Sequence, residues 1–164
     1  MTREQKYNSF KALHERPGIF IIPNPWDAGT AKILTALGFE ALATTSAGYA
    51  FSAGRTDSTS ALNRDGILAN AKVIVEATHL PVSADLQDGF GPSPETCAAT
   101  IQLASGIGLA GGSIEDASDD VNKPIYDLQL SVERIEAAAE TARTHHFLLT
   151  ARRSEEHTSE LQSQ

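Results

Sequence analysis

Carboxylate side chains end two short apolar runs, and they are the residues whose types and spacing most directly indicate chemistry. Pro-Val-Ser-Ala leads into Asp85 and, after two residues, Asp88, while Gly-Gly-Ser-Ile leads into Glu115 and Asp116. A buried strand has no reason to end in charged groups unless the charge is used or neutralised there. One such acid is more often a helix cap or a solvated turn residue. Two such strand ends in succession predict a site for Mg²⁺, which takes a few carboxylate oxygens and keeps some water.

The elements that would bring these acids together follow from the hydrophobic pattern. Short apolar or β-branched runs predict strands, and apolar residues at helical spacing predict helices. The expected strands are residues 19–22, 41–45, 81–86, 109–114 and 147–150. The expected helices begin near residues 3, 26, 63, 93 and 127, and the last should bury Val132, Ile135, Ala139 and Ala142. Residues 49–62 are expected to form a long polar loop, which is more often functional than accidental.

Five alternations of strand and helix indicate an α/β protein with a parallel sheet and a functional edge at the strand C-termini. Two architectures share this pattern. The units could form an open doubly wound sheet, or they could be the first five of the eight units of a (β/α)₈ barrel, which usually needs about 250 residues. Residues 106–111 match G-x-G-x-x-G, but they leave a helix and enter a strand, the reverse of the order that dinucleotide binding requires.

Composition excludes several classes of protein. With 164 residues, 41% hydrophobic content and a net charge of -8, the chain has the composition of a single globular domain without a basic surface for nucleic acid. Its one cysteine, Cys97, excludes a disulfide framework or a cysteine zinc site and favours a reducing, cytoplasmic setting. The N-terminus has no signal-like apolar region and no run approaches membrane-spanning length, so neither export nor a membrane partner is expected.

Six motifs, in chain order, together resemble the isocitrate lyase/phosphoenolpyruvate mutase superfamily. Any one of them is weak, but six at the expected strand ends are specific, and they cover nearly all of residues 10–152. The most distinctive is Ala-Asp-Leu-Gln-Asp-Gly-Phe-Gly at 84–91. The motifs lie at residues 22–28, 44–48, 54–57, 84–91, 112–116 and 149–152.

The resemblance implies a (β/α)₈ barrel enzyme that binds Mg²⁺ and a small 2-oxo acid and cleaves or rearranges the C–C or P–C bond next to the carbonyl. It makes Asp85 the central metal-side carboxylate and Glu115 a water-mediated or outer ligand. The superfamily commonly has Asp-x-Asp where this chain has Asp85-Leu86-Gln87. Both Gln87 and Asp88 therefore remain candidates to complete the metal site.

The remaining site residues also follow from the resemblance. Substrate binding is assigned to Arg152 and to Thr45, Ser46, Ala47 and Gly48, whose hydroxyl and amide groups would hold a carboxylate or phosphonate. The catalytic residues would be Asp57, near the substrate on the loop, and Arg152, which would clamp the developing charge. The chemistry is coherent, because the enolate left by breaking a bond next to a carbonyl needs a positive partner fixed in advance.

The absence of a cysteine narrows the reaction class. The lyase branch of the superfamily carries Lys-Lys-Cys-Gly-His on a gating loop, with the cysteine as general acid, but the equivalent residues 117–123 contain none. Cys97 lies in an alanine-rich helix, where a buried, inert thiol is expected. A phosphonomutase-like or oxaloacetate-decarboxylase-like activity is therefore favoured. His145 and His146 are interpreted as a helix-end feature and not as metal ligands.

Residues 153–164 differ from the rest, because they lack apolar periodicity and resemble the in-frame translation of a common sequencing-library adapter. We interpret residues 1–152 as a partial (β/α)₈ catalytic domain and 153–164 as a non-native tail. A barrel without its last strands has an open sheet edge, which predicts weak stability. The full-length form is expected to be a homo-oligomer, since superfamily members are commonly tetramers. The alternative is a self-contained five-unit α/β module that binds a small molecule without catalysis.

Overall fold

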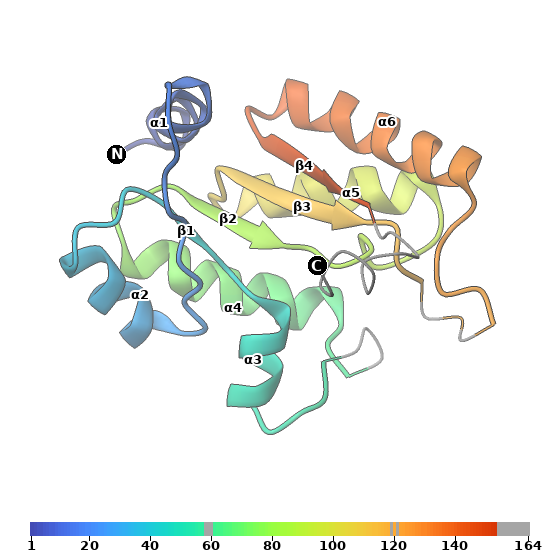
Figure 1. The fold of residues 1–164 in the computed structure, drawn as a ribbon, viewed down its shortest axis with the longest axis horizontal. Coiled ribbons are helices and arrows are strands. Elements are labelled where there is room, and N and C mark those ends of the chain that lie inside the picture. Colours follow the sequence, from blue (N-terminus) through green and yellow to red (C-terminus); the bar gives the residue numbers. More distant parts are fainter. Residues whose placement is uncertain (58–60, 119, 121, 154–164) are drawn as a thin grey trace, which may run out of the picture.

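Four parallel strands form one sheet, with helices before and between them (Figure 1). The computed structural model describes residues 1–57, 61–118, 120 and 122–153, so residues 154–164, which make up most of the predicted tail, lie outside the described part. The strands are β1 (Leu42–Ala43), β2 (Val82–Asp85), β3 (Gly111–Glu115) and β4 (Leu148–Arg152). The helices are α1 (Arg3–Glu15), α2 (Ala28–Ala36), α3 (Ser46–Ser52), α4 (Arg64–Ala77), α5 (Pro94–Gly106) and α6 (Leu128–Thr144).

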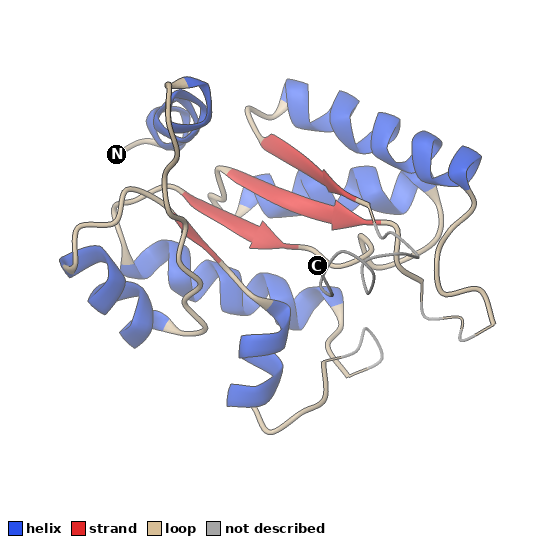
Figure 2. Ribbon diagram, viewed as in Figure 1, coloured by secondary structure: helices blue, strands red, loops and turns tan. Residues whose placement is uncertain are grey.

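The strand order distinguishes the two predicted architectures. A doubly wound sheet reverses its order at a switch point, whereas here each strand pairs with the next one in the chain, β1-β2-β3-β4. All three pairings are parallel, and the arrowheads in Figure 2 point the same way. α2 packs on α4, α4 on α5 and α5 on α6. This is the arrangement of consecutive units of a barrel.

The two faces of the sheet differ in polarity. Val82 and Ala84 of β2 belong to the main hydrophobic core, which the sheet shares with α4, α5 and α6, whereas Ser83 and Asp85 are partly exposed on the other face. The same alternation in β3 buries Ile114 and leaves Glu115 partly exposed. Because side chains alternate along a strand, the strands deliver one polar side chain after another to the face away from α4, α5 and α6.

Phe10 of α1 closes the polar face at the N-terminal ends of β3 and β4. It forms a second hydrophobic cluster with Leu13, Ala41 and Ala110. A Cβ at Gly111 would lie 2.6 Å from the carbonyl oxygen of Leu148 and 2.9 Å from the Phe10 ring. Glycine at this position therefore permits both the β3–β4 pairing and the docking of α1.

Two expectations about secondary structure are wrong. Residues 19–22 form no strand: Ile19 and Ile21 are 92% and 67% exposed, and the following Pro23 and Pro25 have no N–H group to donate to a ladder. One backbone bond, from Ala43 N–H to the Pro23 carbonyl at 3.1 Å, ties the segment to β1. Part of the expected loop 49–62 is helical, because Thr45 caps α3 by accepting a hydrogen bond from Gly48 N–H at 3.1 Å.

The predicted helix starts at residues 63 and 93 are confirmed. The side chains of Asn63 and Ser93 accept hydrogen bonds from the backbone N–H groups of Gly66 and Thr96, and Pro94 occupies the first helical position of α5. In the described part of the chain, no helix combines the length and the apolar character that crossing a membrane requires.

Candidate active site

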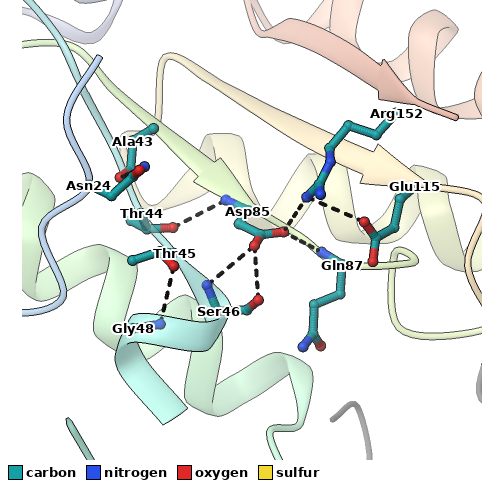
Figure 3. Close-up of polar contacts among 10 residues, drawn as sticks. All are labelled: Asn24, Ala43, Thr44, Thr45, Ser46, Gly48, Asp85, Gln87, Glu115 and Arg152. Atoms are coloured by element: carbon teal, nitrogen blue, oxygen red, sulfur yellow. Dashed lines mark hydrogen bonds and ion pairs between the residues drawn. The ribbon is translucent and has the colours of Figure 1, made fainter. Parts of the chain in front are cut away.

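Three side chains from adjacent strand ends converge on one point. Arg152 at the end of β4 directs its guanidinium between Asp85 of β2 and Glu115 of β3 (Figure 3). Its Nη1 lies 3.6 Å from Asp85 Oδ1 and 3.3 Å from Glu115 Oε2. The register explains the meeting, because Glu115 pairs with Arg152 and Asp85 pairs with Ser113, two residues before Glu115. The two acids that the sequence singled out therefore share one cation of the protein.

Asp85 is held by several short contacts that fix its orientation. Oδ2 accepts hydrogen bonds from the Ser46 hydroxyl at 2.9 Å and from the Ser46 N–H at 3.3 Å, at the first residue of α3. Oδ1 accepts from the N–H of Gln87 at 3.1 Å, and the Asp85 N–H donates to the hydroxyl of Thr44, also at 3.1 Å. Loop, helix and strand thus position this carboxylate together.

Glu115 lies in a less favourable environment for a negative charge. Burial raises the pKa of its carboxyl, the Arg152 guanidinium lowers it, and the neighbouring carboxylates of Asp85, Asp88 and Asp116 raise it further. The net direction is upward. Burial is the main cause of this rise and the neighbouring carboxylates add to it, so a cation bound here would favour the ionised form of Glu115.

Gln87 and Asp88 both lie in the loop after β2, in different hydrogen-bonding environments. Asp88 is 6% exposed, and both its oxygens are engaged: Oδ1 accepts from the N–H of Phe90 at 2.8 Å and Oδ2 from the hydroxyl of Tyr126 at 2.9 Å. Gln87 is also buried, and its Oε1 has no hydrogen-bond partner among the described residues. In Figure 3 the Gln87 side chain points away from Arg152. An unpartnered buried oxygen is costly, so the Gln87 amide oxygen has room for a further partner. The Asp88 oxygens each accept one hydrogen bond, as the oxygens of Asp85 also do, so both Gln87 and Asp88 remain candidates.

The donor set fits a hard divalent cation that keeps part of its water shell. Within the described ranges, no three His, Cys, Asp or Glu side chains form a cluster that could hold a metal by themselves. Two carboxylates, Asp85 and Glu115, are nevertheless oxygen donors at one edge of the sheet, where both lie beside the Arg152 guanidinium. Mg²⁺ is usually bound by one or two carboxylates, with water and substrate completing six ligands.

The other predicted site residues are placed less directly. Thr45 and Gly48 use their hydroxyl and N–H to cap α3, and Ser46 binds Asp85, so these groups are engaged within the protein. Ala47 lies in the first turn of the same helix. Asp57 is exposed in the segment after α3, and within the described part it makes no ion pair with Arg152. Contact of these residues with a substrate stays a prediction.

Two cavities adjoin the converging side chains. One of about 270 Å³ lies against Asp85 and Arg152 and is lined also by Asn24, Thr44 and Ser113, with further residues of β1 and β2. Its lining is mainly polar because it lies on the face of the sheet away from α4, α5 and α6. A second cavity of about 770 Å³ lies between the ends of β3 and β4 and α6.

The sequence analysis did not identify Tyr126 and Arg134, which contact the loop after β2. Tyr126 binds the Asp88 carboxylate, and burial followed by this hydrogen bond raises the pKa of Tyr126 to about 12. Arg134 of α6 donates from Nη2 to the main-chain carbonyl of Asp88. The predicted stripe of α6 is confirmed in part: Ala142 is buried and Ile135 packs against the core, but Val132 is exposed, and the fully buried residues are Arg134, Ala138 and Ala142. The only signal in the sequence is the i, i+4, i+8 spacing of these three residues.

Comparison with known proteins supports the resemblance. The family model described as phosphoenolpyruvate phosphomutase matches residues 10–162. The chain is 30% identical over 138 residues to 2,3-dimethylmalate lyase of Eubacterium barkeri, a match that covers 80% of this chain and 47% of that protein. A crystal structure from Burkholderia cenocepacia J2315, named only provisionally as a lyase/mutase, matches with a TM-score of 0.89 and 55% identity, over 93% of this chain and 54% of that one.

A third match is the structure of oxaloacetate acetylhydrolase in complex with the product oxalate, with a TM-score of 0.83 and 27% identity, over 92% of this chain and 54% of that chain. The chain thus spans about half the length of these proteins. The predicted α/β fold of barrel type is confirmed by the parallel sheet and these structural matches. Since the family model covers nearly the whole sequence, the chain belongs to the phosphoenolpyruvate phosphomutase family, in the PEP mutase/isocitrate lyase superfamily.

Proposed function

We propose that this chain carries the Mg²⁺ and substrate site of an enzyme that cleaves or rearranges the bond next to the carbonyl of a small 2-oxo acid. The observation that carries the proposal is the convergence of Asp85, Glu115 and Arg152 from three adjacent strand ends. Membership of a superfamily of lyases and mutases, and the likeness to a hydrolase solved with the two-carbon diacid oxalate, support a small acidic substrate.

The proposed cation site consists of Asp85 as the central ligand, with Glu115 and either Gln87 or Asp88 completing it directly or through water. Asp88 remains an alternative to Gln87 in this set; its two oxygens accept hydrogen bonds from the Phe90 N–H and the Tyr126 hydroxyl, which leaves each a further lone pair. When bound, Mg²⁺ supplies a fixed positive charge for the oxygen of an enolate. Ser46 holds Asp85 in the orientation that this role requires.

The proposed substrate position is the polar cavity of about 270 Å³ beside Asp85 and Arg152. A 2-oxo acid of three or four carbons fits this volume, and the Asn24 amide and the Ser113 hydroxyl at its wall can bind acid oxygens. Arg152 is partly exposed and reaches the cavity, so its guanidinium can pair with the substrate carboxylate or with charge that develops in the reaction. The site thus combines orientation with electrostatic stabilisation.

The experiment follows enolate formation directly. The chain is incubated in D₂O with pyruvate, with and without Mg²⁺, and exchange of the methyl protons is followed by proton NMR; consumption of oxaloacetate is measured in parallel. Asp85→Asn, which keeps the shape of the side chain, is the control for catalysis by free metal. We expect Mg²⁺-dependent exchange that falls at least ~100-fold in Asp85→Asn.

The possible results separate the alternatives. Equal exchange in the two proteins would refute the proposed role of the site. Binding of oxaloacetate or oxalate without turnover of either test compound would instead favour a small-molecule-binding module. If exchange depends on Mg²⁺ and on Asp85, a panel of 2-oxo acids would identify the substrate. Analysis of the products would show whether the reaction is a lyase cleavage, a mutase rearrangement or a decarboxylation.

A further inference from the structure

We propose that Arg134, with Tyr126, is a positioning residue for the cation site: its buried guanidinium holds the Asp88 carbonyl and thereby fixes the turn that aligns Asp85 with Glu115. The inference rests on the proposed function, because it concerns the same site. Neither residue lies at a strand end, and neither reaches the converging carboxylates; they act through the loop after β2.

The loop after β2 has a backbone that needs external support. Gln87 and Phe90 have positive φ angles of 49° and 66°, in the left-handed region that residues with a side chain seldom occupy, and Gly89 lies between them at 83°. Each such non-glycine residue costs roughly 1–2 kcal/mol. The loop therefore keeps this shape only if contacts with the surrounding helices outweigh the cost.

Those contacts come from the two helices that pack behind the loop. The Thr100 hydroxyl of α5 donates to the Gly89 carbonyl at 2.8 Å, and the Arg134 guanidinium of α6 donates to the Asp88 carbonyl. A Cβ at Gly89 would lie 2.9 Å from the sulfur of Cys97, so the loop packs closely against α5. Side chains of α5 and α6 thus hold two successive carbonyl groups.

Arg134 is an unusual residue for a purely structural role. It is 1% exposed, its guanidinium carbon lies 3.8 Å from the centre of the Tyr126 ring, and its Nε has no partner in the described part. Burying a guanidinium costs several kcal/mol, whereas an apolar side chain would fill the same space without that cost. Stacking on an aromatic ring recovers about 2 kcal/mol. The guanidinium is therefore best explained by its bond to the Asp88 carbonyl.

The loop after β2 is hydrogen-bonded to both Asp85 and Glu115 through the backbone of Gln87. The Gln87 N–H donates to Asp85 Oδ1 at 3.1 Å, and the Gln87 carbonyl accepts from the Glu115 N–H at 2.8 Å. One residue in a left-handed conformation thus ties the end of β2 to the end of β3. If the neighbouring Asp88 carbonyl is released, Gln87 can relax to negative φ, and both contacts are lost together.

The test uses three variants of this chain and Mn²⁺ alone as the probe. Arg134→Lys keeps the charge but loses the planar fork and the ring stacking, and Tyr126→Phe removes one hydroxyl while keeping the ring. Arg143→Met changes an exposed arginine on the same helix and is the control. Mn²⁺ affinity is measured by calorimetry, and hydrogen exchange is followed at the amides of Gln87 and Gly89 relative to those of α6.

We expect Arg134→Lys and Tyr126→Phe to bind Mn²⁺ roughly 10–100-fold more weakly and to exchange the loop amides faster, with α6 and Arg143→Met unchanged. Should Arg134→Lys fail to fold, Tyr126→Phe alone gives both readings. Unaltered Mn²⁺ affinity and loop exchange in the folded variants would overturn the positioning role and leave the proposed function standing. If the unaltered chain binds no Mn²⁺, the proposed function fails, and the role of Arg134 toward a cation fails with it.

Discussion

Replacing Arg152 by methionine should destabilise the fold at neutral pH, because it leaves the Asp85 and Glu115 carboxylates together without a cation. At the observed separations of 3.6 and 3.3 Å and an effective dielectric constant of ~20, Coulomb's law gives about 4–5 kcal/mol for each contact. The Arg152 side chain is 54% exposed, so water screens most of this attraction, and exposed pairs contribute only about 0.2–1 kcal/mol each. We expect a loss of roughly 1–2 kcal/mol in the free energy of unfolding from urea titration, with Arg143→Met as the control.

The pH dependence of this loss has a defined sign. The pKa of Glu115 in the folded protein lies above its ordinary value of 4.5, so the folded state binds a proton more tightly than the unfolded state. The resulting stability is fully present below about pH 4.5 and is lost as the pH rises through the folded pKa. The Arg152 guanidinium lowers the pKa of Glu115, so removing it raises that pKa further.

Wild type and Arg152→Met should therefore differ least near pH 4.5 and most at neutral pH. Adding millimolar Mg²⁺ at pH 7 should narrow the difference by restoring a positive charge. Equal unfolding midpoints for the two proteins at pH 7 in EDTA would refute the reasoning, as would a difference that grows on acidification.

Three further changes test the fold around the site. Gly111→Ala should lower the free energy of unfolding by about 1–3 kcal/mol, because the new methyl group would meet Leu148 and Phe10. The control is Gly106→Ala, which has open space around the new methyl group and should not destabilise the fold. Equal urea midpoints for the two variants would contradict this prediction. Asn63→Ala should cost ~1 kcal/mol by removing the cap of α4, and an unchanged midpoint would count against that cap. Cys97 is buried, and burial raises the pKa of its thiol. At pH 8 a disulfide reagent should therefore label Cys97 more than ~100-fold more slowly in the native chain than in the chain unfolded by urea. Similar labelling rates would show that the thiol is accessible in the native chain.

The sequence was most informative where local chemistry decides the structure. Asn63 and Ser93 begin helices by capping, and the strands that lead to Asp85 and Glu115 are short buried runs bounded by turn residues. Their convergence follows from parallel strand order and therefore needed no knowledge of side-chain contacts. Residues 19–22 were wrongly predicted as a strand because their β-branched composition is typical of strands. Whether such a segment pairs in a sheet depends on its neighbours and on the prolines that follow it.

The support behind the site could not be predicted from local patterns. Arg134 is buried although its residue type is normally exposed. Its guanidinium binds the Asp88 carbonyl, 46 residues away in the sequence, and stacks on the nearby Tyr126 ring. The hydrogen bond of the Asp88 carboxylate likewise comes from the Tyr126 hydroxyl, 38 residues away in the sequence. Such long-range polar contacts follow from packing and carry no periodic signal.

Mg²⁺ binding tests the central claim most directly, namely that acids from separate strand ends form one site for a hard cation. Isothermal titration of the chain with MgCl₂ should show one site per chain, weakened at least ~10-fold in Asp85→Asn and in Glu115→Gln. The exposed Glu76 of α4 provides the control, and Glu76→Gln should bind as the unaltered chain does. Absence of Mg²⁺ binding to the folded chain, or equal affinity in Asp85→Asn, would contradict the account.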